Sequence, residues 1–160
     1  IDVKSTLGVG TTMTLVLPRG EQGPSRVRPA PERAPLAPAK ARGAALLVED
    51  DEQVAAVTGD MLEHLGWRVT RAASAEAALA VLSQGASVDL VFSDVMMPGG
   101  KNGIELAKAV RERRSQLPIV LASGYAESVR REAEREGLAL LSKPFDIEAL
   151  AAAVNLATRS

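Results

Sequence analysis

Short aliphatic runs alternate with longer stretches of helical spacing along residues 44–157. The runs predict strands at residues 44–48, 67–72, 89–94, 119–122 and 138–141. The stretches between them predict helices at residues 53–65, 75–84, 103–114 and 126–136, and a last helix begins near Ile147. Such alternation favours one α/β domain, in which a parallel sheet carries helices on both faces.

Apolar stripes indicate which side of each predicted helix faces the sheet. The first helix is expected to face inward through one stripe, formed by Val54, Val57, Met61, Leu62 and Leu65. The inner face of the helix at residues 103–114 is expected to hold Ile104, Ala107 and Val110. Its arginines are expected to face solvent, at Arg111, Arg113 and Arg114.

Polar residues stand at the carboxyl ends of four predicted strands. The third strand ends on Asp94 and breaks into a turn rich in glycine, Pro98-Gly-Gly-Lys-Asn-Gly103. The other strand ends carry Glu49-Asp50-Asp51, Ser123 and Lys143. Ligands of open parallel sheets bind beyond the carboxyl ends of the strands. We therefore expect these groups to meet at one edge, with Asp94 as the reactive residue.

Carboxylates gathered at such an edge require a cation, because two of them about 5 Å apart repel by roughly 3 kcal/mol at an effective dielectric of about 20. Oxygen ligands with room for water suit Mg²⁺. A carboxylate can also act as a nucleophile and form an aspartyl phosphate, which needs mainly positioning and neutralisation of charge. Lys143 would supply a second cation, and Ser123 a hydroxyl donor to a phosphoryl oxygen.

The N-terminal part differs from this domain. Residues 1–18 alternate apolar and polar positions on both sides of a glycine turn, which predicts a β-hairpin too small to be a domain by itself. Residues 19–43 hold five of the nine prolines, and six basic residues against two acidic ones. This composition predicts a flexible, semi-extended linker.

Charge and composition exclude several functions. Residues 44–160 carry 12 basic and 17 acidic residues, so we expect no contact with nucleic acid. No apolar run approaches the roughly 20 residues that span a bilayer, so no membrane contact of this segment is expected. The chain lacks cysteine, which suits the cytoplasm. It does not begin with methionine, and we interpret it as part of a longer protein whose localisation at a membrane stays open.

With these motifs, residues 44–160 resemble the receiver domain of two-component signalling. The resemblance implies a doubly wound (βα)5 flavodoxin-like fold with a five-stranded parallel sheet. Asp94 matches the phosphoacceptor, Glu49 and Asp50 the acidic pair, Ser123 the serine or threonine position, and Lys143 the lysine that precedes a proline. These matches imply that Mg²⁺ is the cofactor.

The same resemblance implies the ligands and partners. Asp50, Asp94 and the backbone carbonyl of Met96 would bind the metal directly, and Glu49 mostly through water. The phosphoryl group would come from the dimerisation and phosphotransfer domain of a histidine kinase, in the same or another chain. A histidine phosphotransfer protein is a further candidate partner.

Residues 1–18 resemble the last two strands of the histidine-kinase ATP-binding domain, through Gly8, Gly10, Thr11 and Leu17-Pro18. The whole chain therefore resembles the C-terminal end of a hybrid histidine kinase. The Asp-x-Gly-x-Gly nucleotide elements of a kinase are absent. We expect no labelling by ATP alone.

Several positions depart from the usual receiver pattern. The turn after Asp94 is one residue longer, and Leu140 occupies a position that is commonly aromatic. Tyr125 could take a related switching role. Met96 and Tyr125 flank the path of attacking water and carry no acid or amide, so slow self-dephosphorylation is expected. His64 lies between leucines without the signature of a phosphodonor and is interpreted as structural.

Two other functions remain as alternatives. An aspartyl-phosphate phosphatase of the haloacid-dehalogenase type would need an Asp-x-Asp after the first strand, where this chain has Glu49-Asp50-Asp51. An interaction module that works without phosphate would not need the complete set of polar strand ends. Whether the chain itself is an enzyme is left open.

Overall fold

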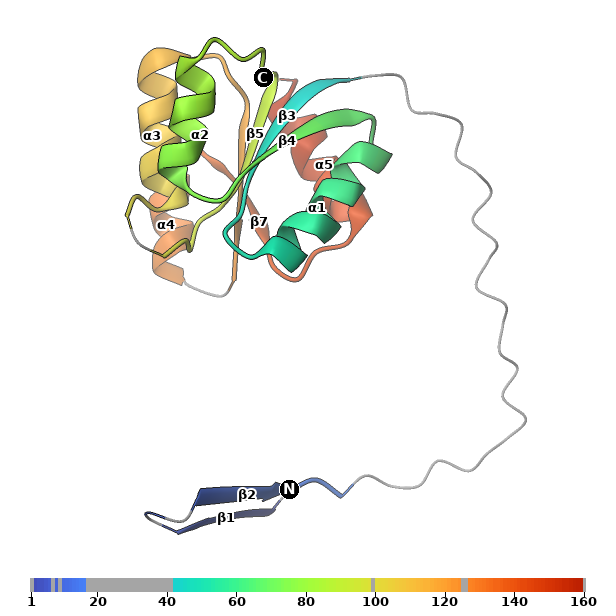
Figure 1. Cartoon of the computed structure of the whole chain (residues 1–160), viewed down its shortest axis with the longest axis vertical. Coiled ribbons are helices and arrows are strands. Elements are labelled where there is room, and N and C mark those ends of the chain that lie inside the picture. Colours follow the sequence, from blue (N-terminus) through green and yellow to red (C-terminus); the bar gives the residue numbers. More distant parts are fainter. Residues whose placement is uncertain are drawn as a thin grey trace, which may run out of the picture. The chain divides into compact units, whose positions relative to one another are not determined.

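The computed structural model describes residues 2–6, 8, 10–16, 42–98, 100–124 and 127–159. Within these residues, two antiparallel strands form one compact unit (Figure 1). A five-stranded sheet with its helices forms the other. In the described parts of the chain, no helix combines the length and the apolar character that crossing a bilayer requires.

The larger unit alternates strands and helices along the chain. Its elements are β3 (Gly43–Val48), α1 (Glu52–His64), β4 (Trp67–Ala72), α2 (Ala75–Ser83), β5 (Leu90–Asp94), α3 (Gly103–Arg113), β6 (Ile119–Ser123), α4 (Glu127–Arg135), β7 (Ala139–Ser142) and α5 (Ile147–Ala157). All neighbouring strands are parallel, in the order β4-β3-β5-β6-β7. This confirms the predicted doubly wound (βα)5 fold.

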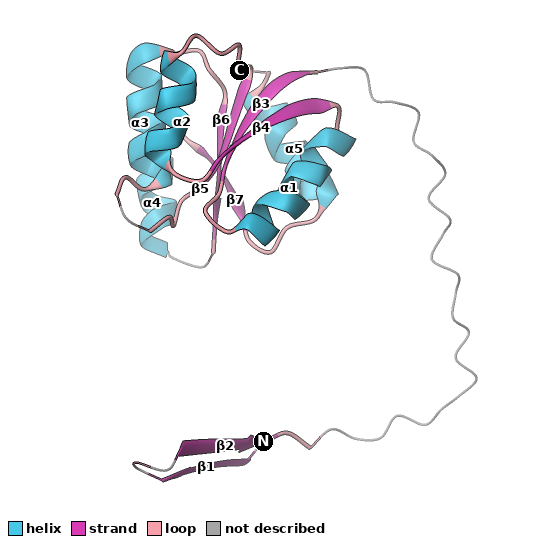
Figure 2. Cartoon of the chain, in the orientation of Figure 1, coloured by secondary structure: helices cyan, strands magenta, loops and turns pink. Residues whose placement is uncertain are grey.

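Helices cover both faces of the sheet (Figure 2). Side chains of α2, α3 and α4 form one core with one face, and those of α1 and α5 form a second core with the other. The central strand β5 contributes Val91 to the first core and Phe92 to the second. Because both faces of β5 are buried, its sequence is a continuous apolar run that ends at the first carboxylate, Asp94.

The stripe predicted for α1 was partly wrong. Leu62 is buried, but Val54 and Val57 are 36% and 56% exposed. Met61 and Leu65 are partly buried against the same core, as predicted. The fully buried face of α1 consists of Leu62 and smaller residues, namely Ala55, Thr58 and Gly59. Both sets have helical spacing, and the smaller side chains allow the helix to lie close to the sheet. The valines therefore remain on the surface.

The prediction that all three arginines at the end of α3 face solvent was also wrong. Arg113 is exposed, but Arg111 and Arg114 are half-buried. Arg114 donates hydrogen bonds to the carbonyls of Leu82 and Ala86, both at 3.1 Å. Arg111 donates to the backbone carbonyls that follow the C-terminal end of α4. The last carbonyls of a helix lack partners within it, so these guanidinium groups satisfy neighbouring helix ends.

The smaller unit is the predicted hairpin. Strands β1 (Asp2–Thr6) and β2 (Gly10–Thr14) pair in antiparallel fashion, and Val3 lies opposite Met13. Both side chains are exposed within this unit. Of the predicted linker, residues 19–43, only Arg42 and Gly43 are among the described residues.

Candidate functional site

Polar side chains meet at the carboxyl edge of the sheet. Glu49 and Asp50 follow β3, Asp94 ends β5, Ser123 ends β6, and Lys143 follows β7. The strands are parallel and hydrogen-bonded side by side, so their carboxyl ends lie together. The structure therefore brings together the side chains of Glu49, Asp50, Asp94 and Lys143, and places Ser123 at the end of the neighbouring strand β6.

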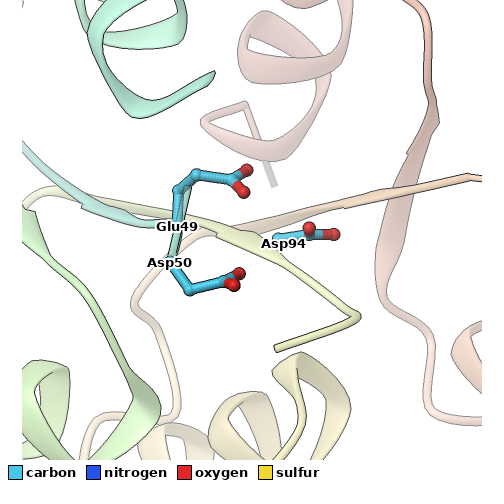
Figure 3. Close-up of side chains that lie close together, drawn as sticks. All are labelled: Glu49, Asp50 and Asp94. Atoms are coloured by element: carbon cyan, nitrogen blue, oxygen red, sulfur yellow. The ribbon is translucent and has the colours of Figure 1, made fainter. Parts of the chain in front are cut away.

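Three carboxylates form the centre of the site. Glu49, Asp50 and Asp94 each offer an oxygen, and these oxygens lie within 4.8 Å of one another (Figure 3). Glu49 is 6% exposed and Asp94 8% exposed, whereas Asp50 is open to solvent. Such an arrangement of negative charge is unfavourable unless cations join it.

Lys143 supplies one of these cations. Its Nζ donates hydrogen bonds to Oε2 of Glu49 and to Oδ2 of Asp94, both at 2.9 Å. The peptide bond between Lys143 and Pro144 is cis. If all four side chains are ionised, the three carboxylates and Lys143 leave a net charge of −2. A divalent cation would balance that charge.

Burial and the charged neighbours shift two pKa values here. The pKa of Glu49 is raised, mainly because the carboxylate is buried. The hydrogen bond from Lys143 lowers this pKa, but the negative charge of Asp94 raises it further. For Lys143, burial alone would lower the pKa. Hydrogen bonds to Glu49 and Asp94, together with their charges, outweigh burial and raise it. The lysine therefore stays an ammonium ion against the carboxylates.

The two oxygens of Asp94 have different partners. Oδ2 accepts the hydrogen bond from Lys143, and Oδ1 faces the backbone N–H of Met96 at 3.3 Å. The backbone of Asp94 is fixed as well, because the Ser93 hydroxyl donates to its carbonyl at 2.8 Å. The side chain of Met96 is 66% exposed. Its backbone carbonyl as a metal ligand stays a prediction.

Ser123 is buried beside these groups. Its hydroxyl donates to the carbonyl of Gly124 at 2.7 Å, and its own carbonyl accepts from the backbone N–H of Lys143 at 2.8 Å. To donate to a group on Asp94, this hydroxyl would have to give up its hydrogen bond to Gly124. Tyr125, the other candidate switch residue, lies outside the described residues.

Two neighbouring polar residues have other positions. Asp51 caps α1, because its Oδ1 accepts hydrogen bonds from the backbone N–H groups of Gln53 and Val54 at 2.8 and 3.0 Å. His64 is the last residue of α1, about 18 Å along the helix from its first residue at a rise of about 1.5 Å per residue. It is exposed and lies away from the carboxyl edge.

One residue that positions Asp94 was not identified from the sequence. Gly103 begins α3 and donates its N–H to the carbonyl of Val95 at 3.0 Å. A Cβ atom at Gly103 would lie 2.2 Å from the carbonyl oxygen of Asp94 and 2.9 Å from Cα of Val95. Only glycine allows this close approach of helix and strand. The available signal was a glycine directly after Asn102, the N-cap of α3.

We expect the Gly103→Ala variant to be destabilised by about 3 kcal/mol, because the added methyl group would displace the backbone of β5. Urea unfolding followed by the fluorescence of Trp67, the single tryptophan, measures this change. Gly124→Ala makes the same chemical change where no atom lies within 4 Å, and its stability should change little. Equal stabilities of the two variants would contradict the close approach.

Comparison with known proteins agrees with this geometry. The model of the family described as "response regulator receiver domain" matches residues 45–155. The response regulator protein FleR of Pseudomonas aeruginosa is 43% identical over 107 residues, which are 66% of this chain and 22% of FleR. The sensor kinase CckA of Brucella abortus is 32% identical over 166 aligned residues, covering 94% of this chain and 17% of CckA. The chain thus spans about a fifth of the length of these relatives.

A solved structure gives the same result. The crystal structure of the receiver domain from the hybrid histidine kinase CckA is 32% identical, with a TM-score of 0.59. It covers 72% of this chain and 99% of that one. From the match of fold, sequence and strand-end residues, we conclude that the chain belongs to the response regulator receiver family of two-component signalling.

Proposed function

We propose that Asp94 accepts a phosphoryl group from a phosphohistidine of a histidine kinase, with Mg²⁺ bound among Glu49, Asp50 and Asp94. One observation carries this proposal. The carboxylate of Asp94 lies at a strand end, with one oxygen on the ammonium group of Lys143 and two further carboxylates within 4.8 Å. Structural roles alone give no reason to gather these charges.

The proposed transfer replaces one bond to phosphorus by another. An oxygen of Asp94 forms a P–O bond, and the P–N bond to the donor imidazole breaks. The electron pair stays on the imidazole nitrogen, which takes a proton from solvent. Lys143, 2.9 Å from Asp94 Oδ2, is placed to stabilise negative charge on the phosphoryl oxygens. Ser123 would donate its hydroxyl to one of them after rotation.

The residues fit Mg²⁺ by their chemistry. The candidate ligands are all oxygens, and the charge of −2 left beside Lys143 equals that of one divalent cation in magnitude. Asp50, Asp94 and the carbonyl of Met96 would bind it directly, and Glu49 mostly through water. When bound, Mg²⁺ supplies neutralisation of phosphoryl charge.

Phosphorylation of this chain by acetyl phosphate is expected to require Mg²⁺. A chelator should reduce labelling to background, because the carboxylate cluster would then repel the incoming anion. Labelling is measured by the mass of the intact protein with Mg²⁺, with chelator, and with Mg²⁺ restored. ATP alone should leave the chain unlabelled. Labelling that persists in chelator would contradict the metal assignment.

The surface beside the site supports the phosphotransfer domain of a histidine kinase as the partner. A groove of about 550 Å³ lies between α1 and the segment after β7, lined by Gln53, Val54, Val57, Thr58, Met61, Lys143, Pro144 and Phe145. Lys143 belongs both to this groove and to the site, so a partner seated there would lie next to Asp94. The exposed valines of α1 offer apolar contact. We assign this groove to the kinase phosphotransfer domain, which must bring its histidine to Asp94.

We expect Val57→Glu to lower the rate of phosphoryl transfer from a phosphorylated kinase about tenfold, since a charge would replace an apolar contact. Labelling by acetyl phosphate should not change, because this small donor needs no docking surface. The donor to be tested first is the sensor kinase CckA of Brucella abortus, a relative of this chain, and its transfer to the parent sets the reference rate. Val16→Glu, at an exposed position of the N-terminal segment, is the matched control. Equal transfer to parent and Val57→Glu would refute this docking surface.

We further propose that residues 1–18 belong to the end of a histidine-kinase ATP-binding domain and that residues 19–43 link it to residues 44–160. The likeness to CckA supports this, because residues 44–160 are less than three quarters of the chain and the alignment covers 94%. The exposed Val3 and Met13 share one face of the hairpin, as expected if further strands cover it. Because a kinase that uses ATP needs the ATP of the cytoplasm, we propose that this signalling takes place there.

A further inference from the structure

The turn that follows Asp94 is fixed at both of its ends by its own neighbours. At its start, Val95 and Met97 are buried. At its end, the Asn102 side chain accepts from the N–H of Glu105 and the Glu105 side chain accepts from the N–H of Asn102, both at 2.9 Å. Among the described residues of the turn, these contacts involve neither Gly100 nor Lys101.

A third contact, with the middle of the turn, comes from α2. Oε1 of Glu76, in the first turn of α2, faces the backbone N–H of Lys101 at 3.4 Å. A Cβ atom at Gly100 would lie 2.7 Å from the same oxygen, so glycine leaves the space that the carboxylate occupies. The partners are 25 residues apart in the sequence. The contact therefore joins two elements rather than continuing a local motif.

The ionised form of Glu76 is favoured in this position. The pKa of Glu76 is lowered, because its carboxylate accepts hydrogen bonds from its own backbone N–H and from that of Lys101. The positive charge of Lys101 acts in the same direction. At neutral pH, Glu76 therefore offers the turn a charged acceptor.

We propose that Glu76 is a positioning residue, which holds the turn after Asp94 against α2 and thereby keeps Met96 beside the carboxylate cluster. This inference rests on the proposed function, in which the Met96 carbonyl is a metal ligand. Without the tie, the turn samples more conformations, and metal binding must order it.

The test compares Mg²⁺ titrations of the full chain by amide NMR shifts, together with hydrogen exchange of the Lys101 amide in metal-free protein. Glu76→Ala is expected to weaken Mg²⁺ binding about fivefold and to speed the exchange. Glu76→Gln loses the charge but keeps an acceptor oxygen, and should restore most of both. Glu148→Ala removes a first-turn glutamate from α5 that has no hydrogen bond or ion pair in the described part of the chain, and should change neither.

Unchanged Lys101 exchange in Glu76→Ala would overturn the proposal. So would equal weakening by Glu76→Ala and Glu76→Gln, because charge rather than the hydrogen bond would then be responsible. If the parent shows no Mg²⁺-dependent shifts at Glu49, Asp50 and Asp94, the proposed function fails. Exchange at Lys101 without metal still decides whether Glu76 holds the turn.

Discussion

The Asp94→Asn variant is expected to take up no phosphoryl group from acetyl phosphate, whatever the Mg²⁺ concentration. Asparagine has nearly the same shape, so the strand end should keep its conformation. The amide lacks the anionic oxygen that forms the bond to phosphorus, and it removes one of the carboxylates that would hold the metal. The mass of the intact protein, recorded over time after addition of the donor, measures this loss.

Asp51→Asn is the matched control, since it makes the same change one position beyond the acidic pair. Its carboxylate caps α1 and lies outside the cluster of three. Asparagine is also a good N-cap, so labelling should stay near that of the parent. If Asp94→Asn were labelled as fast as Asp51→Asn, Asp94 could not be the acceptor.

Replacement of Lys143 by methionine is expected to slow labelling by acetyl phosphate about 100-fold or more. The ammonium group of Lys143 lies 2.9 Å from both Glu49 and Asp94. Removal of one such preorganised donor typically has an effect of this size. Mg²⁺ should bind at least as tightly as in the parent, because the carboxylates lose a competing cation. The rate of labelling should therefore fall while the affinity for Mg²⁺ does not.

Lys108→Met provides the comparison for Lys143→Met. Lys108 also forms two ion pairs, with Glu132 and Glu136 at 3.5 and 3.2 Å, but these lie on the surface between α3 and α4. Its loss should leave labelling and metal affinity unchanged. A parental rate in Lys143→Met, or a large loss of Mg²⁺ affinity, would contradict the role of Lys143.

The fold followed from the sequence where burial determined the residue pattern. The run from Leu90 to Ser93 is apolar or small because both faces of β5 are buried, and the strand ends at Asp94. The inner face of α1 could not be chosen in this way. Val54 and Val57 have the same helical spacing as Ala55 and the small residues near it. Which set faces the sheet depends on how closely the helix packs, a tertiary property.

The residues of the site could be predicted where they stand at the end of a strand. Asp94, Ser123 and Lys143 each stand at the end of a recognisable apolar run, and parallel strands bring such ends together. Gly103 and Glu76 were not identified, for a different reason. Their roles depend on the path of the backbone after Asp94. Gly103 is needed because an added Cβ atom would lie 2.2 Å from the carbonyl oxygen of Asp94, and Glu76 accepts a hydrogen bond from Lys101. Neither feature leaves a periodic pattern in the sequence.

The most direct test of the account is identification of the phosphorylated residue. After reaction with acetyl phosphate and Mg²⁺, reduction with borohydride converts an aspartyl phosphate to homoserine, which peptide mass spectrometry can locate. The account predicts homoserine at position 94 in the parent, and none in protein treated with chelator. Modification at Asp50 or Glu49, or a phosphoryl group retained on His64, with position 94 unchanged, would contradict it.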